Sequence, residues 1–167
     1  DNFSTPEHPR YVLGSLGPGT KLPTLGHTTY EYLRDAYEVA AKGLIEGGCD
    51  GLLIETAQDL LQAKAAVNGS RAAIKNAGRD IYLMAQVTVE ATGTMLLGSE
   101  IGAALTALEP LGIDSIGLNC ATGPTEMSEH LRQLSQQTNI AITCMPNAGL
   151  PVLGPNGAHY PLSPVDL

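Results

Sequence analysis

The chain has 167 residues, of which 43% are hydrophobic, so the composition predicts one folded domain rather than a disordered segment. The formal net charge of -8 argues against nucleic acid or an anionic membrane as the main partner. No apolar run approaches the roughly 18 residues of a membrane span, and three widely spaced cysteines favour a reducing, cytoplasmic compartment over a disulfide framework.

Five short apolar runs recur at about the 30-residue period of a strand-helix-strand unit. They are nearly continuous rather than alternating, which is typical of strands buried on both faces of a parallel sheet. The predicted strands are residues 11–13, 51–54, 81–84, 113–118 and 140–142.

Helical patterns fill the four gaps between these strands. Thr28 to Glu31 is a capping-box pattern that opens the first helix. Thr56 and Asp59 are expected to open the second, Ile101 lies near the start of the third, and Pro124 starts the fourth. The Gly- and Pro-rich tail from 151 to 167 shows no helix or strand pattern.

Strict alternation of strands and helices indicates an α/β fold with a parallel sheet. Two architectures compete, a doubly wound open sheet and a (β/α)8 barrel. A barrel typically needs about 250 residues, and this chain could hold only five of its eight strands. Length alone therefore favours the open sheet.

Polar side chains follow several of the predicted strands. In parallel α/β folds the carboxyl ends of the strands meet on one face and form the site. The strand ends offer Gly14 to Gly17 with Ser15, Glu55 with Thr56, Gln86 with Thr88, Asn119 with Cys120, and Asn147.

Cys120 is the most informative of these residues, because a buried strand ends in Asn119-Cys120. A thiol there is a soft metal ligand or a nucleophile, or else a small buried hydrophobe. One cysteine does not make a catalytic zinc site, which normally takes three protein ligands. Cys49 precedes a strand and therefore lies at the amino-terminal end of the sheet, away from the site. Cys144 is expected to have a packing role in the core or near the site.

Glu55 ends an apolar strand, where a carboxylate is costly without a partner. It could bind a substrate ammonium group or act as a base, or it could have a capping or ion-pairing role. No lysine ends a strand, so a Schiff-base mechanism lacks its nucleophile. The segment 14–19 is rich in glycine but lacks the phosphate-loop and dinucleotide patterns.

Together the strand ends resemble the homocysteine S-methyltransferase family. The resemblance rests on the order and spacing of four motifs between about residues 11 and 149. The motifs are Gly14-Ser15-Leu16-Gly17-Pro18, Leu53-Ile54-Glu55-Thr56, Gly117-Leu118-Asn119-Cys120 and Pro146-Asn147-Ala148-Gly149.

The resemblance implies a (β/α)8 barrel and reverses the argument from length. Residues 1–167 would be an internal part of the homocysteine-binding barrel domain, covering strands three to seven. Both end strands would then be open edges, at residues 11–13 and 140–142. The family holds zinc by three thiolates, of which Cys120 matches the first. The later Gly-Gly-Cys-Cys that supplies the other two does not occur in this chain.

The implied reaction is zinc-dependent transfer of a methyl group to the homocysteine thiolate, which forms methionine. Glu55 would contact the homocysteine amino group, while Ser15, Thr88, Asn119 and Asn147 would line the substrate site. The methyl donor would be methylcobalamin on another module. The alternatives are betaine or another small donor, or a non-catalytic binding piece in which Cys120 is merely buried.

Overall fold

The computed structural model describes residues 3–155 and 157–165, so positions 1–2, 156 and 166–167 of the expected domain and tail lie outside it. Five parallel strands form one sheet in the order β1-β2-β3-β4-β5. They are β1 (Leu13–Leu16), β2 (Gly51–Ala57), β3 (Tyr82–Val87), β4 (Ser115–Asn119) and β5 (Ala141–Met145). Each starts one or two residues later than predicted, except β2, which starts at the predicted residue.

Four α-helices alternate with the strands, as predicted. They are α1 (Tyr30–Glu46), α2 (Leu60–Ala77), α3 (Ile101–Leu108) and α4 (Pro124–Gln137), with short 3-10 turns η1 (Pro23–Leu25) and η2 (Glu109–Leu111). Thr29, and not the expected Thr28, caps α1, because its side chain accepts a hydrogen bond from the Tyr32 amide. Asp59 caps α2 as expected.

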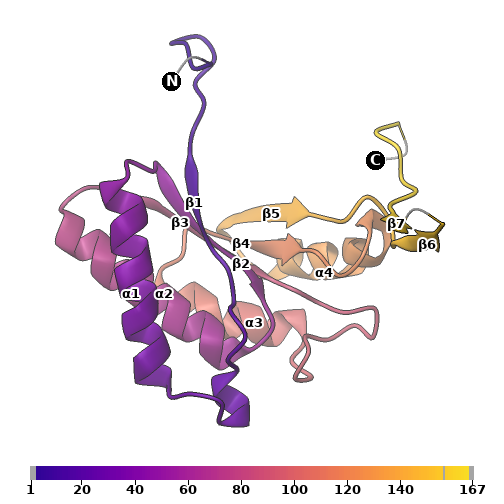
Figure 1. The fold of residues 1–167 in the computed structure, drawn as a ribbon, viewed down its shortest axis with the longest axis horizontal. Helices are drawn as coiled ribbons and strands as arrows, with labels where there is room; N and C mark the ends of the chain where they lie inside the picture. The colour runs from indigo at the N-terminus through magenta and orange to yellow at the C-terminus, as the bar shows by residue number, and fades with distance from the viewer. Residues whose placement is uncertain (1–2, 156, 166–167) are drawn as a thin grey trace.

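The helices all lie along one face of the sheet (Figure 1), and each packs against the next helix in the chain. A doubly wound sheet would reverse its strand order at a switch point. The sequential, all-parallel order found here is instead that of a barrel wall. The preference for an open sheet that followed from chain length is therefore wrong.

The apolar core lies between the helices and this face of the sheet. In β2, Leu52 and Ile54 belong to the core cluster, whereas Glu55 lies on the opposite face, because successive side chains in a strand alternate. Buried Gln86 and Ser115 share that opposite face. The face that becomes the interior of a barrel therefore carries polar side chains beside the buried apolar Leu53 and Met84.

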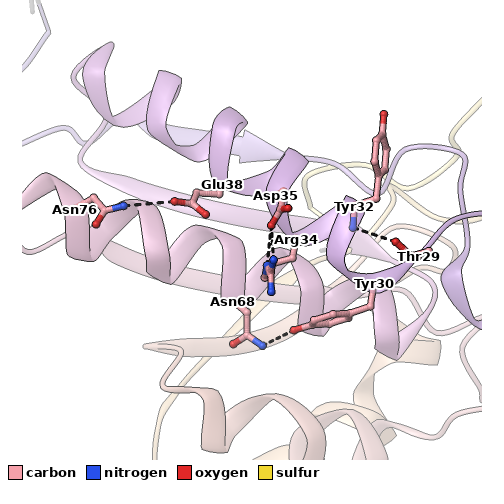
Figure 2. A network of polar contacts seen from close by, with 8 residues as sticks. All are labelled: Thr29, Tyr30, Tyr32, Arg34, Asp35, Glu38, Asn68 and Asn76. Atoms are coloured by element: carbon pink, nitrogen blue, oxygen red, sulfur yellow. Dashed lines mark hydrogen bonds and ion pairs between the residues drawn. The ribbon is translucent and has the colours of Figure 1, made fainter.

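Helices α1 and α2 pack closely, and polar contacts border the interface (Figure 2). The Asn68 amide donates to the Tyr30 hydroxyl at 2.6 Å, and the Asn76 amide donates to Glu38 at 3.4 Å. Between these contacts lies Gly69, where an added Cβ would lie 2.3 Å from the Arg34 carbonyl oxygen. Only a residue without a side chain permits this approach of the two backbones.

Gly69→Ala in the full-length protein is expected to destabilise the barrel by about 3 kcal/mol, because the methyl group would overlap backbone atoms that cannot rotate away. Gly43→Ala is the matched control, since Gly43 is an exposed residue of α1 with no atom near its hypothetical Cβ. That change should stabilise the helix by about 0.5–1 kcal/mol. Denaturant unfolding measures both, and equal effects of the two substitutions would contradict the prediction.

The tail contains a short antiparallel hairpin that the sequence patterns did not predict. Its strands are β6 (Val152–Gly154) and β7 (Gly157–His159). Gly157 has φ 103°, a value that side chains disfavour. Strands of three residues are too short to show a hydrophobic alternation, which is why the pattern was missed.

Strands β1 and β5 are the two edges of the sheet, since each has one neighbour among the described strands. The first and last predicted strands are thus edges as expected, although the paired residues lie further along the chain. Exposed apolar side chains occur on both edge strands, including Leu13, Ile142 and Met145. No helix in the described part of the chain has the length and apolar character needed to cross a bilayer.

Candidate functional site

Three neighbouring strands bring the candidate residues together at their carboxyl ends. Glu55 and Thr56 lie near the end of β2, Thr88 follows β3, and Asn119 and Cys120 end and follow β4. Side chains at these positions meet because parallel strands all end on one face of the sheet. The structure therefore joins Thr88, Asn119 and Cys120 to Thr56, beside Glu55, whose carboxylate contacts Ser15.

Asn119 is the centre of the cluster and is buried. Its Oδ1 accepts a hydrogen bond from the Thr56 amide at 2.8 Å, and its Nδ2 donates to Thr56 Oγ1 at 2.7 Å. The same Nδ2 lies 3.3 Å from Cys120 Sγ. Thr88 Oγ1 donates to the Asn119 carbonyl at 3.1 Å. The side chain of Asn119 thus connects the ends of β2 and β4.

The backbone of the cluster is strained. Thr56, Cys120 and Ala121 have φ of 59°, 60° and 57°, and they are the non-glycine residues with positive φ in the described part of the chain. Such conformations cost on the order of 1–3 kcal/mol each and persist where surrounding contacts impose them. The pairing of β2 with β3 also shifts register between Ile54 and Ala57, on either side of Glu55 and Thr56. Such β-bulges are frequent beside active sites.

Thr56 does not open α2, as the sequence suggested, because it belongs to β2. Its place at the end of a strand was predicted, but its pairing with Asn119 was not, since neither that pairing nor its left-handed backbone leaves a pattern in the sequence. The signal available was its position directly after Glu55, at the carboxyl end of a buried strand.

Glu55 has a hydroxyl partner from the neighbouring strand. Ser15 Oγ on β1 donates a hydrogen bond to Glu55 Oε1. Glu55 is half-buried, and none of the ion pairs among residues 3–155 and 157–165 involves it. Its negative charge is therefore free to interact with a cationic group of a ligand.

Cys120 is half-buried and follows β4 directly, whereas Cys144, near the carboxyl end of β5, pairs with Leu118. Cys49 is buried before β2, at the opposite end. Cys144 on β5 is exposed, although its Sγ lies 3.7 Å from Met127 Sδ of α4, and partial desolvation raises the pKa of this thiol. Within the described ranges, no cluster of three or more His, Cys, Asp or Glu side chains could hold a metal ion.

Asn147 lies beside the cysteine turn through its backbone. Its amide donates to the Thr122 carbonyl at 3.0 Å, and the Cys120 amide donates to the Met145 carbonyl at 3.2 Å. The loop after β5 is thereby attached to the turn that carries Cys120. Asn147 itself is half-buried, one strand away from the Asn119 cluster.

Comparison with solved structures identifies the architecture. The apo form of the homocysteine methyltransferase MmuM from Escherichia coli matches with a TM-score of 0.67 and 19% identity, over 82% of this chain and 48% of that one. An isomerase from Streptomyces coelicolor A3(2) matches with a TM-score of 0.55 and 16% identity, over 81% and 33%. At these identities the likeness concerns the fold, and this chain covers part of a (β/α)8 barrel.

Comparison of sequences identifies the family. Methionine synthase of Mycobacterium leprae (strain TN) is 67% identical to the chain, and that of Mycobacterium tuberculosis (strain ATCC 25618 / H37Rv) is 68% identical. Both alignments cover the whole chain, which spans 14% of the length of each relative. The family model of homocysteine S-methyltransferase matches residues 1–167. The chain therefore belongs to the homocysteine S-methyltransferase family.

Proposed function

We propose that residues 1–167 are an internal part of the homocysteine-binding barrel domain of a zinc-dependent methyltransferase that forms methionine. The observation that carries the proposal is the joint placement of Glu55 and Cys120 at the carboxyl ends of β2 and β4, which only β3 separates. Homocysteine carries an ammonium group and a thiol. A carboxylate and a metal-binding sulfur in one site match those two groups.

The surroundings of Cys120 suit a zinc thiolate. Its sulfur faces the Asn119 Nδ2 donor at 3.3 Å, and the Thr56 hydroxyl lies 4.0 Å away. Hydrogen bonds to an anionic acceptor are stronger than those to a neutral one. Cys120 fits one ligand position of a three-thiolate site, and we place the other two ligands outside this chain. Zinc would supply charge that keeps the bound homocysteine thiol deprotonated.

The residues of the chain then have distinct roles. Glu55, oriented by Ser15, binds the homocysteine ammonium group and fixes the amino-acid end of the substrate. Asn119 and Thr88 hold the end of β4, so that the Cys120 sulfur keeps one direction. Asn147 completes the substrate site from the loop after β5. These contacts orient the substrate sulfur for attack on the methyl group.

The methyl donor in this proposal is methylcobalamin, held by another module of the protein. Its support is the similarity to the mycobacterial methionine synthases, of whose length the chain spans 14%, which leaves ample chain for further modules. The three unpaired cysteines are consistent with the reducing, cytoplasmic location proposed for this enzyme.

Glu55→Gln in the full-length, zinc-loaded protein should weaken homocysteine binding by about tenfold or more, because a charge-assisted hydrogen bond is worth roughly 1.5–3 kcal/mol. Isothermal titration calorimetry measures the affinity, and elemental analysis should find the zinc content unchanged. Glu31→Gln is the matched control, since it removes the same charge from an exposed position of α1. An unchanged affinity, or loss of zinc together with the fold, would contradict the assigned role.

A further inference from the structure

Thr56 makes two hydrogen bonds to one side chain. Its backbone amide donates to Asn119 Oδ1 at 2.8 Å, and its hydroxyl oxygen accepts from Asn119 Nδ2 at 2.7 Å. Because a backbone N–H can only donate, the atom facing it must be the amide oxygen. The pairing with Thr56 thus fixes which end of the Asn119 carboxamide points where.

This orientation determines what faces the sulfur of Cys120. The amide nitrogen of Asn119 carries two hydrogens. One is directed to Thr56 Oγ1, and the other is directed to Cys120 Sγ at 3.3 Å. The Thr56 hydroxyl already accepts from Asn119, so its own hydrogen can point toward the same sulfur, 4.0 Å away. Two polar groups therefore border the sulfur, and Thr56 supplies one of them and orients the other.

The backbone conformation makes this arrangement possible at a cost. Thr56 has φ 59°, which is a genuine outlier for a β-branched residue. In this conformation its amide and its hydroxyl both reach the Asn119 side chain, which is buried. Strain of this kind persists where surrounding contacts impose it, and it concentrates at functional sites.

We propose that Thr56 is a positioning residue for the Cys120 sulfur, acting through Asn119. The inference rests on the proposed role of Cys120 as a zinc ligand and adds the group that orients it. Partners that lie behind a metal ligand set its direction, and their loss typically lowers metal affinity or activity about 10–100-fold. Thr56 would thus set metal affinity and site geometry through the contacts of Asn119 with the Cys120 sulfur.

Thr56→Val in the full-length protein tests the proposal, because it removes the hydroxyl and keeps the β-branched shape. Zinc affinity, measured by competition with a chelator in the absence of substrate, should fall about tenfold or more. The visible absorption of the cobalt-substituted protein should shift, since it reports the geometry around the metal. Thr56→Ser, which keeps the hydroxyl, should keep zinc affinity within about twofold of the wild type and leave the cobalt spectrum unchanged.

Thr106→Val is the control, since Thr106 is an exposed residue of α3 whose hydroxyl donates to the Gly102 carbonyl of the same helix. It should leave zinc affinity and the cobalt spectrum unchanged. If valine at this backbone conformation impairs folding, judged by circular dichroism, Thr56→Ala repeats the test without the β-branch. A folded Thr56→Val or Thr56→Ala protein with wild-type zinc affinity and spectrum would overturn the proposal, as would equal loss in Thr56→Ser.

Failure of this inference can be told apart from failure of the proposed function. If Cys120→Ala loses zinc while folded Thr56→Val and Thr56→Ala retain it with an unchanged spectrum, the positioning role alone is wrong. If Cys120→Ala keeps zinc, the ligand role of Cys120 is wrong, and the positioning proposal is overturned with it.

Discussion

Cys120→Ala in the full-length protein is expected to lower methyl transfer to homocysteine by at least about 100-fold and to reduce bound zinc. Loss of a partner behind a metal ligand alone typically costs about 10–100-fold, and this change removes a proposed ligand itself. The fold should be kept, because Cys120 is half-buried in a turn and is not part of the core cluster. Steady-state kinetics and elemental analysis measure the two effects.

Cys144→Ala provides the matched control. It removes the same atoms from a thiol that lies on β5 against Met127 of α4, away from the Asn119 cluster. Zinc content and methyl transfer should both stay close to wild type. Undiminished activity in Cys120→Ala would eliminate the catalytic role of this thiol and leave the alternative that it is simply a half-buried residue.

The order of strands and helices could be predicted from the sequence because each element has a strong local signal. Ile113 to Leu118 is a continuous apolar run, and it forms the buried strand β4 apart from its first two residues. Asp59 directly precedes an amphipathic run, which predicts an N-cap, and it does cap α2. The carboxyl-end rule for parallel sheets then placed Glu55, Thr88, Asn119 and Cys120 together before any geometry was known.

Features that depend on tertiary geometry could not be predicted in this way. Whether Thr28 or Thr29 caps α1 depends on where the chain turns, and both residues can accept the hydrogen bond. The left-handed conformation of Thr56 exists because Asn119, from a strand 63 residues later in the chain, pairs with it. Chain length favoured the wrong architecture, because an argument from length holds only where one chain contains the whole sheet.

The sheet edges have an energetic consequence. A barrel pairs its first strand with its last and so has no edges. In the described part of this chain, β1 and β5 each keep one side without a strand partner. Unpaired edge strands expose amide and carbonyl groups that can pair with another chain. Polar groups on the inner face add a second cost to the stability of the chain. Gln86 Oε1 and Ser115 Oγ are buried there without a hydrogen-bond partner in the structure.

The isolated 167-residue chain is therefore expected to aggregate, to associate with itself or to unfold over a broad temperature range. Apolar side chains at both edges add to the tendency, since Leu13 is 38% exposed, Ile142 36% and Met145 45%. Exposed apolar edge strands are sites of aggregation. Static light scattering should detect species larger than a monomer, and thermal unfolding followed by circular dichroism should lack one sharp transition.

Co-expression with the remaining strands of the barrel should suppress this behaviour, because strands that pair with β1 and β5 would cover both edges. The comparison distinguishes edge exposure from general instability, which added strands would not correct. A chain that is a compact monomer on its own, with a single cooperative transition, would contradict the prediction. In that case the contacts of α1 to α4 with one face of the sheet would suffice for stability.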